Sequence, residues 1–274
     1  MNTLLKIEWL KIKNYGAFKI LSIFFAAGVV LTNYAVYAFN KNIIGNTGAG
    51  AIMSSFSPYS FSNTWQSTSY ATGYLLILPA MIIIMLITNE YTFRTSRQNI
   101  IDGWSRQEFI MVKLLLALLI AVVSTLLVLL TAFIFGLISG SSFSLNGFSH
   151  VGFFFLKALS YNMFAVLVAV LVKKTGFAIG LYFIYLGAEN FISQMLDILS
   201  MKIKKDNGTD LGSIGDYLPI NAADGLLTFP DNPLKTLAKA ALPTDYFWLV
   251  LAFAVFYLFL FIWWSWKKYL KADL

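Results

Sequence analysis

Long apolar runs, separated by short polar stretches, make up most of the chain. Six runs approach or exceed the roughly 20 residues that an α-helix needs to cross about 30 Å of hydrocarbon. We expect spans at about residues 17–39, 70–88, 109–138, 151–172, 176–199 and 245–266, with a kink at Pro79 in the second. The pattern therefore predicts an all-α polytopic membrane protein with six transmembrane helices, built as one domain over residues 1–274.

The first residues of the chain alternate apolar and basic side chains. Over residues 1–16 this pattern predicts a helix that lies along the membrane surface, with Leu5, Trp9 and Ile12 on one face and lysines directed toward anionic lipid. Trp9 would then lie at the depth of the lipid headgroups. A merely basic tail is the alternative interpretation.

The polar region before the last span, residues 200–244, also contains helical patterns. Asn232-Pro233 has the form of a helix start, because proline fits the first helical position. Residues 218–227 suit a second short helix. We therefore expect an outer helical segment between spans five and six, although an ordinary amphipathic surface loop fits the same residues.

A polar, basic segment at residues 89–104 separates the second span from the third. Ser105 and Glu108 have the spacing of a capping box, and Trp104 and Phe109 have that of a hydrophobic staple. The helix that enters the third span should therefore begin at Ser105. Gly103 should end the helix before it, because glycine readily takes the left-handed conformation of a helix end.

Residues 90–101 are long enough for about three helical turns before that glycine. Phe93, Ile100 and Trp104 fall on one side of this helix, whereas two arginines fall on the other. The pattern predicts a short amphipathic helix lying across the mouth of a two-helix hairpin. Such a helix is suited to docking on a partner.

Composition and charge bear on the orientation of the chain. Hydrophobic residues make up 58% of it and charged residues 12%, about half the share usual in soluble domains. The net charge of +7 is better explained by lysine and arginine at the cytoplasmic ends of spans than by nucleic acid. Most basic residues fall on the side of both termini, so we expect both termini in the cytoplasm and the chain in the cell inner (plasma) membrane. Lys202, Lys204 and Lys205 are exceptions.

The chain carries few of the groups that an enzyme or a metal site needs. It has no cysteine and one histidine, His150, which excludes thiolate sites and a multi-histidine metal site. No nucleophile with a neighbouring base and no Walker-type lysine motif is visible in the sequence. We therefore expect no catalytic residue, no metal and no cofactor of the chain's own, and no ATP hydrolysis by this chain alone.

Lys157 and Glu189 are the notable charges within the predicted spans. Each is sixteen residues from Lys173, at the tight link between spans four and five, so both should lie about 24 Å above that link. Charges at such a depth pair with each other or line a polar pathway. An ion pair that holds the hairpin is one interpretation. A role in substrate passage or gating is the other, and Asn190 and Gln194 favour it by extending a polar stripe.

The segment after the second span resembles a known signature. Its residues are similar to the motif found there in ABC exporter permeases of the type-2 superfamily, which have the ABCG-like, type V fold: Glu90, Arg94, Thr95, Arg97, Asn99, Ile100, Gly103, Ser105, Arg106, Phe109 and Lys113. Many members carry glycine where this chain has Arg94. The resemblance implies that residues 89–104 form a cytoplasmic coupling helix, seated in a groove of a separate ATPase. It also implies a helix along the membrane before the first span.

The resemblance further implies which residues meet the ATPase. These are Glu90, Phe93, Arg94, Thr95, Arg97, Asn99, Ile100, Gly103, Trp104 and Arg106. The expected function is that of the transmembrane permease subunit of an ATP-binding-cassette exporter. ATP and Mg²⁺ would be bound by the partner ATPase subunit, and a second copy or a similar permease would complete a dimer in the membrane lipid.

Two other classes fit parts of the same pattern. A permease-like membrane anchor of a gliding or secretion machine would transmit force rather than move a substrate. A secondary transporter would need ion-coupling carboxylates and usually an internal repeat, and this chain offers Glu189 and no visible repeat. ATP dependence in reconstituted vesicles would separate an exporter from a secondary transporter.

Overall fold

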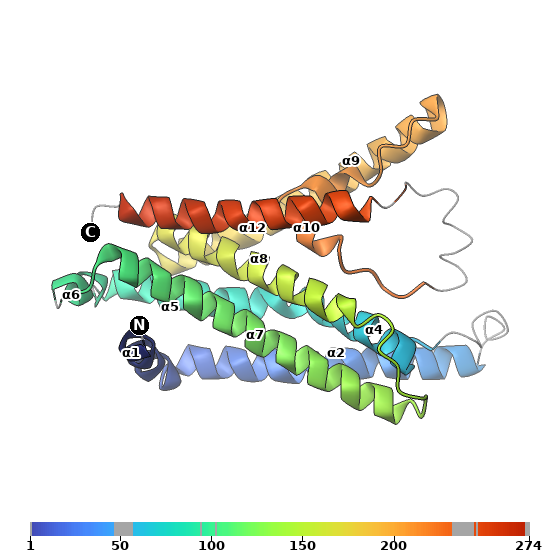
Figure 1. The fold of residues 1–274 in the computed structure, drawn as a ribbon, viewed down its shortest axis with the longest axis horizontal. Helices are drawn as coiled ribbons and strands as arrows, with labels where there is room; N and C mark the ends of the chain where they lie inside the picture. Colours follow the sequence, from blue (N-terminus) through green and yellow to red (C-terminus); the bar gives the residue numbers. More distant parts are fainter. Residues whose placement is uncertain are drawn as a thin grey trace.

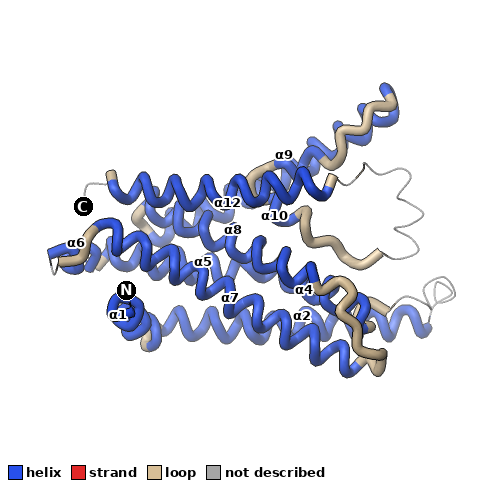
Figure 2. Tube along the Cα trace, in the orientation of Figure 1, coloured by secondary structure: helices blue, strands red, loops and turns tan. Residues whose placement is uncertain are grey.

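The described part of the chain is helical throughout. The computed structural model describes residues 2–46, 57–93, 95–101, 103–231, 244 and 246–271. These residues form helices joined by turns and loops, and contain no strand (Figure 2). The longer helices run side by side along one axis of an elongated bundle (Figure 1). The predicted all-α class is confirmed.

Six helical stretches of the described residues are long and apolar enough to cross a membrane. They lie in α2 (Gly16–Asn46), in α4 (Phe61–Gly73) together with α5 (Ile77–Thr92), and in α7 (Arg106–Ile138), α8 (Ser149–Val172), α9 (Thr175–Asn207) and α12 (Phe247–Leu270). The short helices α1 (Asn2–Lys13) and α6 (Thr95–Ile101) lie toward the end of the bundle that holds both termini (Figure 1). The six predicted spans are therefore confirmed.

The second span begins earlier than its hydrophobicity predicts. Residues 61–69 are rich in serine and threonine, which predicts an outer loop, but they form most of α4. Some of their polar groups find partners inside the bundle. The Thr64 hydroxyl donates to the Ala132 carbonyl (3.0 Å), and the Trp65 indole donates to the Ser144 carbonyl (2.9 Å). These hydrogen bonds allow a polar helix to pack against α7.

A 3-10 turn, η1 (Tyr74–Leu76), joins α4 to α5. It lies just before Pro79, whose ring nitrogen cannot donate to the carbonyl of Leu75 four residues earlier. The helix is therefore irregular just before Pro79, and the predicted kink at this proline stays a prediction. Gly73, at the end of α4, lies so close to α8 that an added Cβ would be 3.0 Å from the Lys157 ammonium.

α8 is the central helix of the bundle. It packs against α4, α5, α7, α9 and α12, and most of its residues are buried. Ala158, Ala165 and Ala169 are fully buried, and small residues of this kind let membrane helices approach closely. Neighbouring helices on several sides therefore hold the side chains of α8 in place.

α9 diverges from the bundle and extends beyond it (Figure 1). Its 33 residues correspond to about 50 Å of helix, more than the hydrocarbon of a bilayer requires. The sequence predicts an end near residue 199, but the helix continues to Asn207 and stops where Gly208 takes a φ of 70°. The predicted tight link to α8 is confirmed: Lys173, with a φ of 59°, and Lys174 connect the two helices.

The outer region before α12 folds back against the bundle. It contains a 3-10 turn, η2 (Ile214–Tyr217), and a one-turn helix, α10 (Asn221–Asp224). The short helix predicted within residues 218–227 is confirmed as α10. It packs against α8, α9 and α12 and is therefore partly enclosed. The helix predicted to start at Asn232 lies outside the described residues.

α1 lies where an interfacial helix is predicted, but a different face of it is buried. Glu8 and Ile12 are buried one turn apart, whereas Trp9 is exposed and touches the edge of the Phe18 ring. Trp9 and Ile12 are three residues apart on α1, as predicted, but only Ile12 is buried. The burial is centred on Ile12 and Glu8, because Glu8 turns inward to pair with a lysine of the bundle. The exposed Trp9 is free to reach lipid headgroups.

Candidate functional site: the coupling end and a cavity between spans

The polar segment after the second span forms about two helical turns rather than three. α5 continues through Glu90 to Thr92, and α6 then covers Thr95–Ile101. The Phe93 N–H donates to the Asn89 carbonyl (2.8 Å), so hydrogen bonds of α5 close its own end before α6 begins. The prediction of one helix over residues 90–101 is therefore wrong at its start.

The end of α6 and the start of α7 match the predicted signals. Gly103 has a φ of +101°, and the Trp104 N–H donates to the Asn99 carbonyl (3.0 Å) across the helix end. The Ser105 hydroxyl accepts from the Glu108 N–H (3.2 Å), and the Ser105 N–H donates to the Glu108 carboxylate (2.9 Å). The capping box is confirmed, and it fixes the point at which α7 begins.

Apolar side chains at this end divide between the interior and the surface. Trp104 packs against the main hydrophobic core, with the Lys11 ammonium 5.7 Å from its ring centre. Phe93 is 72% exposed and Ile101 is 82% exposed. The prediction that Phe93 and Trp104 share one side is therefore wrong, and Phe93 and Ile101 form the exposed apolar pair. Arg94 and the side chains of Arg97 and Ile100 lie outside the described residues.

Other residues of the segment connect it to the last span. The Arg106 guanidinium donates to the Leu270 carbonyl at the end of α12 (3.1 Å). Phe109 stacks on Tyr269 with ring centres 4.9 Å apart. Closer to α6, the Thr95 hydroxyl makes a long hydrogen bond of 3.5 Å to the Glu90 carbonyl. The start of α7 and the end of α12 are thus joined beside α6.

Behind α6, two carboxylates and two ammonium groups form what we call the ion cluster. Lys113 on α7 lies 2.6 Å from Glu8 of α1 and 2.9 Å from Glu90 of α5. Lys11 lies 3.0 Å from each of the same two carboxylates. The ion cluster therefore joins three helices with balanced charge. Glu90 is buried in it, away from the surface on which the resemblance implies an ATPase contact.

The ion cluster shifts the ionisation of its two groups on α1. Burial opposes the ionisation of Glu8, but the ammonium groups of Lys113 and Lys11 outweigh it and hold the pKa of Glu8 below its ordinary value. Burial also opposes the charge on Lys11, but the carboxylates of Glu90 and Glu8 outweigh it and raise the pKa of Lys11. Both groups are therefore charged near neutral pH.

A cavity of about 320 Å³ lies between the second, fourth and fifth spans. Residues of these spans and of α10 line it: Gly73, Tyr74, Ile77, Lys157, Tyr161, Phe183, Leu186, Gly187, Glu189, Asn190, Ile220, Asn221 and Asp224. Tyr74, Phe183 and Asn190 are exposed, so the cavity opens to the surface of the bundle. The equal depth predicted for Lys157 and Glu189 agrees with their lining one cavity.

Lys157 pairs with Asp224 rather than with Glu189. Its ammonium lies 3.1 Å from the Asp224 carboxylate and 5.5 Å from the centre of the Tyr161 ring. The Tyr161 hydroxyl donates to the other oxygen of Asp224 (3.0 Å). The predicted ion pair between Lys157 and Glu189 is therefore wrong, because the outer region brings its own carboxylate to the lysine.

Glu189 holds the start of α10. Its Oε1 accepts hydrogen bonds from the N–H groups of Ile220 (2.6 Å) and Asn221 (2.8 Å). The Tyr185 hydroxyl also approaches this carboxyl group. Oε2 is buried and makes no hydrogen bond of good geometry with the described residues. The carboxylate thus supports the outer region with one oxygen, while the other has no hydrogen-bond partner among the described residues.

The predicted polar stripe on α9 continues from Glu189 along one side of the helix. The Gln194 amide donates to Asn190 (2.6 Å), and both side chains are exposed. Further along, Asp197 accepts from the Gly215 N–H (2.9 Å). The structure therefore brings Asn190 to the rim of the cavity and leaves Gln194 beside it.

With this geometry in view, the chain can be compared with known proteins. The sequence model of a family described as ABC-2 family transporter protein matches residues 4–188. The chain belongs to this ABC-2 family. A comparison with curated proteins gives no match.

The ABC-2 match confirms the family that the residues after the second span resemble. It runs from α1 into α9 and includes α6 and the ion cluster. This ABC-2 protein is a multi-pass membrane protein with a permease-type role in transport. The matched residues end just before Glu189, so Glu189, Asp224 and the outer region lie outside the match.

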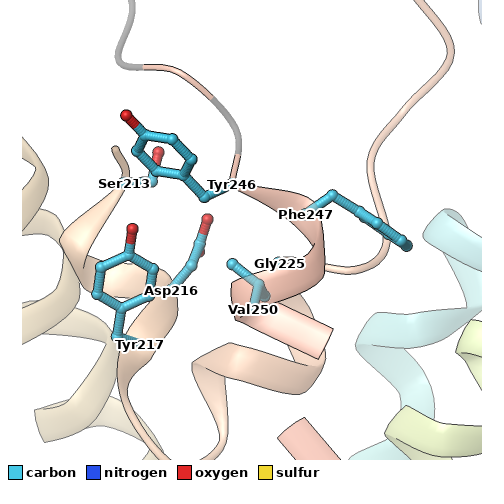
Figure 3. A pocket seen from close by; sticks show the side chains of 7 residues that line it. All are labelled: Ser213, Asp216, Tyr217, Gly225, Tyr246, Phe247 and Val250. Atoms are coloured by element: carbon cyan, nitrogen blue, oxygen red, sulfur yellow. The ribbon is translucent and has the colours of Figure 1, made fainter. Parts of the chain in front are cut away.

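A second, much smaller cavity of this ABC-2 protein lies where the outer region meets α12. Figure 3 shows the side chains of Ser213, Asp216, Tyr217 and Tyr246 converging on it. Its volume of about 30 Å³ is enough for a water molecule but not for an organic substrate. The larger cavity between the spans is therefore the better candidate for a pathway in this ABC-2 protein.

Two ion-pair partners, Glu8 and Asp224, were not predicted from the sequence. Glu8 is the sole acidic residue of α1. Its spacing of three residues from Lys11 is a signal that could have predicted an ion pair between the two. Asp224 gives no such signal, because it lies in a polar region and far along the chain from Lys157. Only the folding back of the outer region brings Asp224 to its partner.

Proposed function

We propose that the chain is the transmembrane permease subunit of an ATP-binding-cassette exporter. It moves a substrate across the membrane with energy from ATP, which a separate cytoplasmic ATPase subunit binds with Mg²⁺ and hydrolyses. The observation that carries the proposal is the ion cluster behind α6. It ties α1, α5 and α7 together at the place where a partner would push.

The geometry suits a segment that transmits movement from a partner to the spans. Phe93 and Ile101 offer an exposed apolar contact on and beside α6, and Thr95, Asn99 and Gly103 shape the same segment. Removing one partner from a buried ion pair costs about 3–5 kcal/mol, so the ends of α1, α5 and α7 should move as one unit. A push on α6 is thereby passed to the second and third spans rather than absorbed locally.

The same proposal sets the assembly and the orientation. α6, both termini and most basic residues share one end, which the proposal places in the cytoplasm, with the chain in the cell inner (plasma) membrane. A second copy or a similar permease would pair with this chain to complete the pathway. The large apolar side chains exposed along α2 and α9 provide surface for that partner and for lipid.

The test is ATP-driven transport by the chain with its ATPase in vesicles. Phe93→Ser combined with Ile101→Ser should abolish co-purification of the ATPase and the stimulation of ATP hydrolysis, with membrane insertion unchanged. A matched control is Phe143→Ser with Leu145→Ser, because these residues are 60% and 61% exposed at the opposite end. Equal losses in both double variants would contradict docking at α6. Stimulated ATP hydrolysis without movement of any substrate would instead indicate a force-transmitting anchor.

A further inference from the structure

The charges that line the cavity do not balance. Lys157 and Asp224 neutralise each other at 3.1 Å. Glu189 lines the same cavity, is 6% exposed, and forms no ion pair with the described residues. A carboxylate at this depth in a membrane needs a partner of opposite charge. With Glu189 ionised, the cavity therefore has one negative charge in excess, which a bound cation would balance.

One oxygen of Glu189 makes no hydrogen bond of good geometry with the described residues, although the Tyr185 hydroxyl approaches the carboxyl group. Oε1 is occupied by the two N–H groups that begin α10, and a third donor, the Asn221 amide, lies 3.4 Å away. Oε2 is buried, lacks a hydrogen-bond partner among the described residues, and belongs to a side chain that lines the cavity. A positively charged hydrogen-bond donor bound in the cavity would supply the partner that the Glu189 carboxylate lacks.

The walls of the cavity also favour a cation with an apolar body. The rings of Tyr74 and Tyr161 already hold the Lys157 ammonium at 5.6 and 5.5 Å, which shows that their electron-rich faces turn toward positive charge. Ile77, Phe183 and Leu186 supply apolar surface beside them. An anion would meet the same ring faces and an unpaired carboxylate, so it should be excluded.

From this geometry we infer that the cavity binds cationic amphiphiles, molecules that join an ammonium group to an apolar body, and that Glu189 selects their charge. The inference rests on the proposed export function and names the substrate class of that pathway. Glu189 acts by contact with the ammonium group, while Lys157 and Asp224 neutralise each other and shape the opposite wall.

The test is a fluorescence titration of the purified full-length chain in lipid nanodiscs, without ATP or ATPase. Three probes share a dansyl body and a five-carbon linker: dansylcadaverine, which ends in an ammonium group, its neutral N-acetyl derivative, and an analogue that ends in a carboxylate. The wild type should bind dansylcadaverine about tenfold or more tightly than the acetylated probe, the change that one charged hydrogen bond gives. The carboxylate should bind most weakly.

Glu189→Gln removes the charge but keeps an oxygen that can accept from the Ile220 and Asn221 N–H groups. It should bring the affinities of the ammonium and acetylated probes close together. Asp197→Asn is the matched control: it makes the same chemical change on the same helix, at a carboxylate that also accepts an N–H from the outer region. Asp197→Asn should leave the ranking of the three probes unchanged.

Equal binding of the ammonium and acetylated probes by the wild type would overturn the inference, as would preference for the carboxylate or equal losses in both variants. If Glu189→Gln fails to fold, the wild-type ranking still decides, and Leu186→Trp, which fills the cavity, should weaken all three probes. Because the titration needs no ATPase, a loss of ATP-driven transport with the ranking retained would contradict the export function alone. Transport that persists without cation preference would contradict this inference alone.

Discussion

Glu8, Lys11, Glu90 and Lys113 are held at the end of the bundle at distances of 2.6 to 3.0 Å. Taking charges out of water costs several kcal/mol for each ion, and the cost is offset only where the partners are close and well oriented. Each carboxylate of the ion cluster contacts both ammonium groups. The ion cluster therefore depends on all four residues, and the loss of one should destabilise the charges that remain.

Lys113→Met should lower the stability of the folded chain by about 3–5 kcal/mol, because Glu8 and Glu90 would then face each other with only Lys11 between them. Adding Glu8→Gln should recover part of the loss, since one carboxylate and one ammonium group would remain. Thermal unfolding of the purified protein measures both effects. Lys267→Met removes an exposed lysine of α12 and serves as the control, with little expected change. A Lys113→Met protein as stable as this control would show that the ion cluster does not stabilise the folded chain.

The lowered pKa of Glu8 predicts how acid acts on the ion cluster. The folded pKa lies below the ordinary value of 4.5, so the stability that Glu8 contributes is present above that pH and is lost as the pH falls through the folded pKa. The difference in melting temperature between the wild type and Glu8→Gln should be largest near neutral pH and should shrink in acid. A difference that stays constant across the acid range would show that Glu8 is not ionised in the folded chain.

At the scale of elements, α10 is fixed between α8 and α9 by two charged contacts. Glu189 accepts the N–H groups at its start, and Lys157 pairs with Asp224 at its end. A carboxylate at the start of a helix and an ammonium group near its end both complement the helix dipole. The outer region is thus attached to the spans at the cavity itself, and movement between α8 and α9 should move α10.

A double-mutant cycle tests which charges pair. Lys157→Met and Asp224→Asn should each destabilise the protein, because each leaves one charge at the cavity without its partner. The two together should recover most of the loss. The combination of Lys157→Met with Glu189→Gln should not recover, since Asp224 would remain unpaired. Thermal unfolding of the four variants gives the measurement. Recovery in the second combination but not in the first would return the pairing to Lys157 and Glu189.

These elements show which structural features could be predicted from the sequence and which could not. The spans, the capping box at Ser105 and the helix end at Gly103 are set by local patterns, and they could be predicted. The depth of Lys157 and Glu189 follows from counting residues along two helices. Their partners could not be predicted, because hydrophobicity does not reveal that a polar region folds back into the bundle. The polar helix α4 could not be predicted for a related reason: its Thr64 hydroxyl bonds to the carbonyl of Ala132, 68 residues further along the chain.

For the whole molecule, the two ends of the bundle differ in the elements that they gather, and the proposed function assigns a separate role to each. α1, α6 and the end of α12 gather at one end, and the turn between α7 and α8 lies at the other (Figure 1). The exposed pair of Phe93 and Ile101 belongs to the first end, whereas the long α9 extends beyond the bundle. An ATPase and the released substrate would thus meet opposite ends of one chain. This division requires a defined orientation in the membrane.

Single cysteines test that orientation against a clean background, because the chain has no cysteine of its own. Gln98 and Lys268 are exposed at the end with α6 and the C-terminus, and Asn146 and Asn207 are exposed in the turn before α8 and at the end of α9. In intact cells an impermeant thiol reagent should label Asn146→Cys and Asn207→Cys. Gln98→Cys and Lys268→Cys should react only after the membrane is permeabilised.

All four variants should react in permeabilised cells, which controls for the accessibility of each thiol. The labelling pattern follows from six crossings with α6 in the cytoplasm, where basic residues are retained. Labelling of Asn207→Cys is the most informative result, because Lys202, Lys204 and Lys205 precede it on α9 and oppose an outer location. If Asn207→Cys is protected while Asn146→Cys reacts, α9 does not cross the membrane as proposed. If Gln98→Cys reacts in intact cells, α6 cannot meet a cytoplasmic ATPase.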